Sequence, residues 1–467
     1  MRRTLVAALC AALALSSPSS GATPTVSGGP TPGIPCAAGS HPEVMQGRAP
    51  LADVATGRAA LGYTCNAVQA GHFGLSGGYR VERYVDAAGH ECAFYDSDTF
   101  VGNTTIKYGP GYTGVFVLDM HDPAHPTRTA ILRTAAMQSP HESLRLNPKR
   151  GLLAAALSTA STGPGIVDVY DVKTDCRQPK LLSTTPLGVL GHESSFAPDG
   201  KTFYVSSLNL HSLAAVDLTD PTAPSLLWIS YSYGAHGMSS SLDGKRLYVA
   251  DVSDNGFNGL KVLDVSQIQN RTPNPAVTVV SQLTWPQVSI PQNATPFTRG
   301  GHPYVLETDE FGERVTGAAR IIDIADEKHP FVVSNLRLKV NQPEVYDEIQ
   351  ADPGNSGAAR GYQAHYCTVP SRLDPNVVAC SFLDSGLRVF DIRNPAKPLE
   401  IAYFNQIEIN AVTGESNGGF TMSAPAFDPV THDIWYGDDN TGFYVVRLTG
   451  AAAKIPFAQK TYLQPGS

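Results

Sequence analysis

Five histidines each stand at the start of a short apolar run, and imidazoles gathered in one place could bind a metal ion. They are His141 in PHESLRL, His192 in GHESSFAP, His236 in AHGMSSSL, His302 in GHPYVLE and His365 in AHYCTVP. Imidazole nitrogens suit Cu, Fe and Zn. Because the five share one local context, we expect them to occupy equivalent places in a repeated structure.

Two carboxylates, Glu142 and Glu193, directly follow two of these histidines. A carboxylate beside a metal-bound imidazole can orient the ring or accept a proton, so both are candidate catalytic residues. The same groups could instead be charges at the rim of a pore that hold Arg145 or a lysine. The chain contains no Walker loop and no HExxH motif.

A second pattern recurs after the histidines, in which an apolar run ends in Asp and leads into a Pro-containing turn. Six aspartates end such runs, with spacings of 52, 46, 47, 59 and 68 residues: Asp119, Asp171, Asp217, Asp264, Asp323 and Asp391. The run suits a strand buried on both faces, and the Asp carboxylate can cap the turn. Units repeated at this period indicate stacked blades or a solenoid.

Each unit holds four expected strands: the His-led strand, its hairpin partner, the run that ends in Asp, and a strand after the turn. With GFYVVRLTG as a degenerate seventh copy, the pattern predicts an all-β fold, a seven-bladed β-propeller of four-stranded blades. The last unit lacks an outer strand, and we expect residues ~63–70 to supply it and close the ring. The histidines would then start the innermost strands and meet at one channel mouth. Residues 266–301 and 339–364 are interpreted as insertions.

The repeated element, a glycine, four apolar residues, Asp and two spaced prolines, resembles the LVIVD repeat of exported bacterial β-propellers. The resemblance covers about residues 67–450, and the seventh copy departs from it by lacking the Asp. It implies the propeller fold and export. It implies little about activity.

The N-terminus predicts export independently. Two arginines precede an apolar run from Leu5 to Leu15, and small residues follow, which is typical of a signal peptide over residues 1–22. We then expect an N-terminal extension over 23–62, the propeller over 63–450 and a C-terminal tail over 451–467. The apolar run is too short to cross a bilayer in the mature protein, and we expect no membrane span. The predicted location is secreted or periplasmic.

Six cysteines remain after the signal peptide, and in an exported chain they predict three disulfides. Cys367 and Cys380 lie symmetrically about the turn SRLDPN, so a hairpin would place them opposite each other, where they can meet disulfide geometry. The other four cysteines allow three pairings, and all three stay open: Cys36, Cys65, Cys92 and Cys176.

Two interpretations of function follow. The net charge of −8 argues against a nucleic-acid partner. In the first interpretation the protein is a non-enzymatic scaffold that binds a small molecule or protein over its channel, and each histidine donates a hydrogen bond to a neighbouring blade. In the second it is a metal-dependent oxidoreductase whose histidine ring binds Cu, Fe or Zn. The ligand, the substrate and the identity of the metal stay open.

Overall fold

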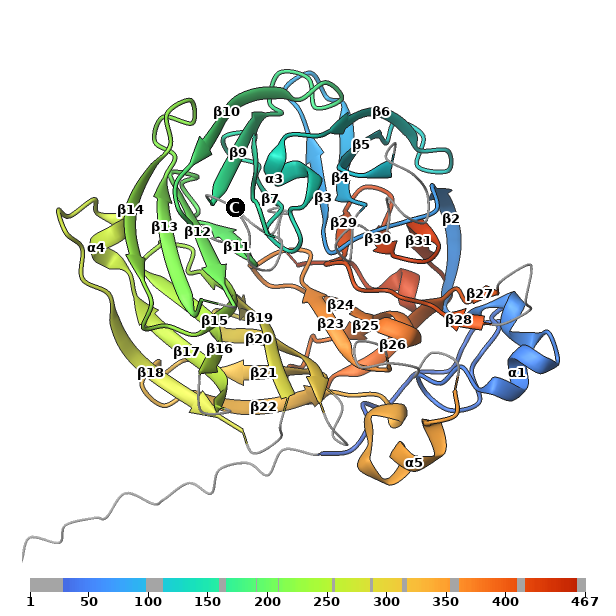
Figure 1. The fold of residues 1–467 in the computed structure, drawn as a ribbon. Helices are drawn as coiled ribbons and strands as arrows, with labels where there is room; N and C mark the ends of the chain where they lie inside the picture. The colour runs from blue at the N-terminus through green and yellow to red at the C-terminus, as the bar shows by residue number, and fades with distance from the viewer. Residues whose placement is uncertain are drawn as a thin grey trace, which may run out of the picture.

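Seven four-stranded antiparallel sheets stand around one ring, which confirms the predicted seven-bladed β-propeller (Figure 1). The computed structural model describes residues 28–459 except 98–111, 159–164, 190, 209, 254–256, 286–288, 313–316, 353–360 and 410–415. The predicted signal peptide therefore lies outside the described residues. Among the described residues, no helix is long and apolar enough to cross a membrane.

The first four blades follow the chain, each from its inner to its outer strand. Blade 1 contains β3 (Val81–Val85), β4 (Glu91–Asp96), β5 (Val115–Asp119) and β6 (Thr127–Leu132). Blade 2 contains β7 (Arg145–Asn147), β8 (Leu152–Ala156), β9 (Ile166–Asp171) and β10 (Lys180–Pro186). Blade 3 contains β11 (Ser194–Phe196), β12 (Thr202–Ser207), β13 (Ser212–Asp217) and β14 (Ser225–Ser230). Blade 4 contains β15 (Ala235–Ser240), β16 (Arg246–Ser253), β17 (Phe257–Asp264) and β18 (Thr278–Thr284).

The last three blades are less regular. Blade 5 contains β19 (Ser289–Arg299), β20 (His302–Gly312), β21 (Ala319–Asp323) and β22 (Phe331–Leu336). Blade 6 contains β23 (Ala364–Thr368), β24 (Val377–Phe382), β25 (Gly386–Asp391) and β26 (Leu399–Asn405), with β1 (Tyr63–Cys65) as a fifth strand. Blade 7 contains β29 (Ala426–Asp428), β30 (Asp433–Asp438), β31 (Gly442–Leu448) and β2 (Ala67–Phe73). The short helix α1 (Leu51–Ala55) precedes β1, and other short helices lie between strands: α3 (Ala135–Gln138), α4 (Ser266–Gln269) and α5 (Tyr346–Ile349).

An N-terminal strand closes the ring, as predicted, but it begins later than expected. β2 pairs antiparallel with β31, and the blue strand lies beside the red ones in Figure 1. Residues 63–65 pair instead with β26 in blade 6. Asn66, in the left-handed conformation with φ 51°, separates the two strands, so the chain changes blade at this residue. Its side-chain amide donates to the carbonyl of Ile401 at 2.9 Å.

The repeated aspartates cap their turns, as predicted. In every copy the carboxylate accepts a hydrogen bond from the backbone N–H two residues later. These residues are His121, Lys173, Thr219, Ser266, Ala325 and Arg393, with distances of 2.7–2.9 Å. This local bond satisfies a backbone donor that the strand leaves unpaired. The repeated Asp therefore stabilises a turn and does not mark a catalytic site.

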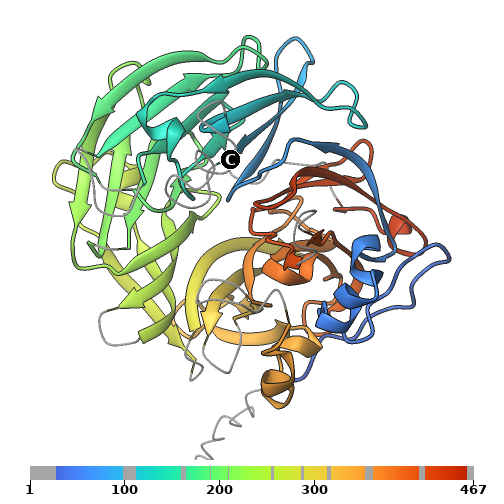
Figure 2. The ribbon, with the colours of Figure 1, turned by 45° about the vertical axis from the view of Figure 1, so that its right-hand side comes forward.

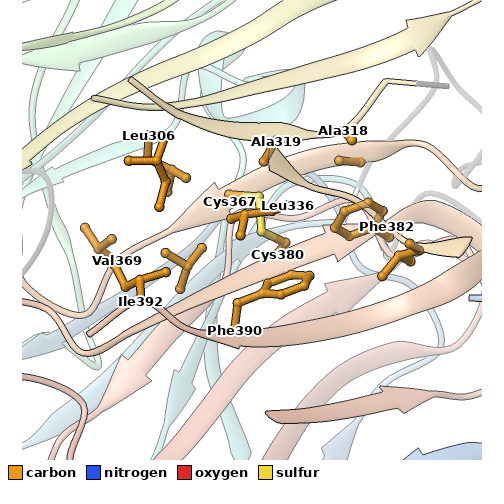
Figure 3. Close-up of a cluster of buried hydrophobic side chains, with 14 of the residues drawn as sticks. Leu306, Ala318, Ala319, Leu336, Cys367, Val369, Cys380, Phe382, Phe390 and Ile392 are labelled. Atoms are coloured by element: carbon orange, nitrogen blue, oxygen red, sulfur yellow. A yellow bond between two sulfur atoms is a disulfide. The ribbon is translucent and has the colours of Figure 1, made fainter. Parts of the chain in front are cut away.

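Apolar side chains from adjacent blades pack into the interfaces between the sheets. In the cluster between blades 5 and 6, Leu306, Leu336 and Phe390 are at most 1% exposed. Figure 3 shows the disulfide between Cys367 and Cys380 inside this cluster, which confirms the predicted pair. The other disulfides join Cys36 to Cys65 and Cys92 to Cys176.

The segment before β1 covers the outer part of blades 5 and 6. Its backbone forms a bridge between Gly33 and Glu400, and Thr31 donates to the carbonyl of Arg337 at 2.7 Å. Glu43 binds the buried guanidinium of Arg388 at 2.7 Å. Figure 2 shows this blue segment, including α1, beside the orange and red blades.

Candidate functional site

The structure brings four of the five singled-out histidines together at one end of the channel. The ring centroids of His141 and His192 are 4.6 Å apart, and those of His192 and His236 are 4.7 Å apart. The Nε2 atoms of His192 and His236 lie only 2.8 Å apart. His365, from blade 6, approaches the same point through Glu142. We call His141, His192, His236 and His365, with Glu142, the histidine cluster.

Glu142 lies among the four imidazoles. Its Oε2 atom is 3.2 Å from Nε2 of His192 and 3.5 Å from Nε2 of His236. Its Oε1 atom is 3.2 Å from Nε2 of His365 and 4.0 Å from Nε2 of His141. The glutamate is 1% exposed, and Oε2 is buried without a hydrogen-bond partner. An orphaned buried carboxylate oxygen that faces ring nitrogens fits a bound cation.

Backbone carbonyls orient two of the rings. Nδ1 of His236 donates to the carbonyl of Pro291 at 2.9 Å, and Nδ1 of His365 donates to the carbonyl of Met422 at 2.6 Å. In both cases the carbonyl belongs to the segment that opens the next blade. The bond directs Nε2 toward the channel, as the outer hydrogen bond does for metal-binding histidines.

A second carboxylate, Glu310 on β20, also faces the histidine cluster. It lies 3.2 Å from Nε2 of His365 and 3.8 Å from Nε2 of His236. Tyr79 closes another side, with its ring centroid 4.2 Å from that of His141. Neither Glu310 nor Tyr79 was predicted from the sequence, because neither lies in the His-led motif that marked the candidate site residues.

The electrostatics favour a cation among these groups. Burial alone would raise the pKa of Glu142, but the imidazoles of His192 and His141 hold it well below its ordinary range. Burial opposes a charge on His365, yet its hydrogen bonds to Glu142 and Glu310 raise its pKa to about 10. The pKa of His236 is also raised, against burial, by the same two carboxylates. Burial, with neighbouring His192, lowers the pKa of His141 to about 3.

His302 does not start an inner strand, and this part of the prediction was wrong. It begins β20, the second strand of blade 5, where it pairs with Arg299 across a Gly300–Gly301 turn. Its side chain is 44% exposed and lies 2.7 Å from Asp323. The true inner strand, β19, falls within residues 266–301, which the sequence pattern marked as an insertion. Its prolines, Pro291 and Pro296, disguise it, because proline is rare within central strands.

Glu193 forms its ion pairs with arginines. It binds the guanidiniums of Arg80 and Arg145, the latter at 2.7 Å, and accepts from the amide of Asn293 at 2.6 Å. Glu193 therefore takes the expected alternative role of holding Arg145. The backbones of Glu142 and Glu193 meet in a parallel β-bridge, so the two carboxylates come from adjacent segments that open blades 2 and 3.

Gly237 makes room for this arrangement. A Cβ atom at this position would lie 1.4 Å from Oε2 of Glu193 and 2.3 Å from the carbonyl oxygen of Gln292. Only glycine therefore lets blade 4 pack this closely against the carboxylate of Glu193. Gly237 is therefore required for steric reasons and contributes no functional group of its own.

The histidine cluster offers ring nitrogens and carboxylate oxygens to a single point. Ligand atoms of His141, Glu142 and His192 all lie within 4.8 Å of one another. A second group with the same property lies at the surface and consists of Asp86, His90 and Asp175. There Asp86 already accepts from the backbone N–H groups of Ala88, His90 and Cys176, so its carboxylate caps a turn.

Comparisons with known proteins identify the fold class. No protein-family model and no curated protein matches the sequence. Among solved structures, the chain is similar to Kuenenia stuttgartiensis hydrazine synthase at 14% identity and a TM-score of 0.50, covering 82% of this chain and 97% of that chain. It is also similar to a periplasmic gluconolactonase of Pseudomonas aeruginosa at 14% identity and a TM-score of 0.47, covering 76% and 92%. Identities this low show the fold alone: the protein is a β-propeller.

Proposed function

We propose that the protein binds one divalent transition-metal ion at the histidine cluster. The observation that carries this proposal is the contact between Nε2 of His192 and Nε2 of His236, with the orphaned oxygen of Glu142 beside both. Ligands about 2.0–2.1 Å from one ion are about 2.9 Å apart in octahedral or square-planar geometry and about 3.4 Å apart in the tetrahedral geometry typical of zinc. The two nitrogens are therefore already spaced as neighbouring ligands.

The donor set limits the choice of ion. It contains imidazole nitrogens and carboxylate oxygens, and all six described cysteines form disulfides. Such a set suits Cu(II), Fe(II) or Zn(II) rather than ions that need thiolates. His192, His236 and Glu142 are the proposed first ligands, and His141 and His365 complete the set. Glu310 would orient His365 and accept protons.

The reaction class that this site suits is oxidative chemistry at a metal with an exchangeable position. Partial exposure of His141 and His192, whose side chains are 24% and 20% exposed, gives that position access from the channel mouth. Glu142 serves here as a ligand. The proton-accepting role falls to Glu310, because it touches two imidazoles without lying between them.

Membership of the LVIVD-type propellers and export from the cytoplasm are part of the same proposal. Six capped Asp turns in register support the first, and three disulfides support the second. Export also fits copper or zinc, which need no reduced thiols for binding.

The experiment measures metal content in the protein produced without a tag. After exposure to Cu(II), Zn(II) or Fe(II) and extensive dialysis, mass spectrometry should find one tightly bound ion per chain. His192→Ala and His236→Ala should each lose it. His302→Ala is the matched control and should retain it, because that imidazole lies outside the cluster. A wild-type protein without bound metal, or equal retention in all variants, would contradict the proposal.

A scaffold function over the channel is the second candidate. The observation that favours it is a cavity whose lining includes Arg80, Arg145 and Tyr366 but no member of the histidine cluster.

A further inference from the structure

The channel continues past the histidine cluster into a separate cavity of about 70 Å³. One water needs roughly 10–15 Å³ on this measure, so the space suits a ligand of a few non-hydrogen atoms. Its walls come from the inner strands and their hairpin turns. The charged lining residues are Arg80, Glu82, Arg83, Arg145 and Arg372.

The cavity carries more positive charge than its described neighbours neutralise. Arg80 and Arg145 share one carboxylate, that of Glu193. Arg83 is paired with Glu91 and Asp428. Glu82, which also lines the cavity, is the other carboxyl group that interacts with Arg80 and Arg145.

Arg372 adds a further positive charge to the lining. Its guanidinium donates to the carbonyls of Pro296, at 3.0 Å, and Ser240, on the two preceding blades. Within the part of the chain that the structure describes, it forms no ion pair. A buried guanidinium held only by neutral carbonyls is a costly arrangement unless an anion joins it.

The pKa shifts of the charged lining residues are consistent with positive charge that is not fully neutralised. Burial, together with neighbouring Arg80, lowers the pKa of Arg145, and burial lowers that of Arg372 to about 10. Burial raises the pKa of Glu82 to about 7 even though Arg145 and Arg80 oppose the change. Glu82 therefore only partly neutralises the wall near neutral pH.

The remaining walls are apolar. Phe196, Val369, Ala424 and Pro425 also line the cavity. A bare inorganic oxyanion would leave these surfaces without a partner, whereas a short alkyl chain would cover them. Guanidinium groups bind carboxylates in a two-point, planar geometry.

We propose that this cavity binds a small organic carboxylate, with Arg145 and Arg372 on the carboxyl group and the apolar wall on its short carbon chain. The site is distinct from the histidine cluster, because no member of the cluster lines this cavity, and the two adjoin where Arg80 donates to the backbone carbonyl of Glu142 at 3.0 Å.

The test is calorimetric titration of the full-length metal-free protein with acetate, propionate and butyrate, with inorganic phosphate and chloride as comparison anions. Propionate should bind at millimolar concentrations or below and raise Tm more than chloride at equal ionic strength. Arg145→Gln and Arg372→Gln should weaken binding roughly tenfold or more, as expected for one lost charge-assisted contact. Arg393→Gln, which removes a half-exposed guanidinium paired with Asp391, should leave binding unchanged.

Because Arg372 also joins three blades, its substitution can change folding as well as binding. A third variant separates the two effects. Ser239→Leu fills the cavity from β15 without removing a charge, and it should abolish propionate binding while Tm is retained. Three results would each overturn the proposal: no carboxylate binding to the wild-type protein, equal binding by all variants, or binding of phosphate in preference to the carboxylates.

Discussion

The Nε2 atoms of His192 and His236 lie 2.8 Å apart, although the residues belong to neighbouring blades and are separated by 44 positions in the chain. Two ring nitrogens at this distance repel each other unless a proton or a metal ion lies between them. Glu142 approaches both atoms from the side. Blades 3 and 4 are therefore joined at this point by a shared proton or, in the proposed function, by a metal ion.

The first prediction concerns coupling between the two residues. In metal-saturated protein, His192→Ala and His236→Ala should each remove the metal-dependent gain in stability, which is about 2.7 kcal/mol at a free metal concentration of 100 times Kd. The double variant should lose little more than either single variant, because the ion is already gone. Denaturant unfolding with and without metal measures this. Losses that add in full would indicate two independent hydrogen bonds.

The second prediction concerns Gly237. Gly237→Ala places a methyl group against Glu193 and the backbone of Gln292, and the backbone cannot move away without shifting blade 5. We expect a loss of about 1–3 kcal/mol in the free energy of unfolding. Gly28→Ala is the control, since nothing lies within 4 Å of its Cβ position. Urea unfolding that gives equal values for both variants would refute the close packing.

The third prediction concerns the pH dependence of the metal-free protein. Hydrogen bonds to Glu142 and Glu310 raise the pKa of His365 to about 10 in the folded state, against about 6.5 in the unfolded chain. Protonated His365 therefore stabilises the fold fully below about pH 6.5, and this contribution declines as pH rises toward 10. His365→Gln should be less stable than wild type at pH 6, with a difference that shrinks by pH 9.5. A difference independent of pH would mean that His365 holds no additional proton.

The fourth prediction ranks two disulfides. The Cys92–Cys176 bridge closes 84 residues and the Cys367–Cys380 bridge closes 13. Loop-entropy arguments give losses of about 4.6 and about 2.9 kcal/mol, respectively, when each is removed. Paired Cys→Ser variants, compared by denaturant unfolding, should follow this order. The opposite order would indicate that burial of Cys367 and Cys380 in the core outweighs chain entropy.

Much of the architecture could be predicted from local pattern. The apolar runs that end in Asp119, Asp171 and their equivalents each predict a strand followed by a capped turn. Tertiary contacts do not change this local preference. Blade 5 could not be predicted in the same way, because β19 contains two prolines and its hairpin turn places His302 after a glycine pair. There the local Gly-His pattern arises from a turn instead of an inner-strand entry.

The chemistry of the site depended on contacts distant in sequence. His141, His192, His236 and His365 were visible because each shares a place in the repeat. Glu310 was not visible, because it comes from the second strand of its blade and meets His236 and His365 only through the packing of adjacent blades. The sequence suggested that Glu142 and Glu193 could hold Arg145, but not that Glu193 would do so while Glu142 faces the histidines. This difference depends on Arg80, whose guanidinium meets Glu193 only in the folded channel.

The most direct measurement is anomalous diffraction at the absorption edge of the bound metal, from crystals of protein loaded with Cu(II) or Zn(II). The account predicts one strong peak about 2.0–2.1 Å from Nε2 of both His192 and His236, with a Glu142 oxygen in the same coordination shell. Loss of that peak in His236→Ala, with the peak retained in His302→Ala, would complete the assignment. No peak in the channel, or a peak only at the surface group of Asp86, His90 and Asp175, would contradict it.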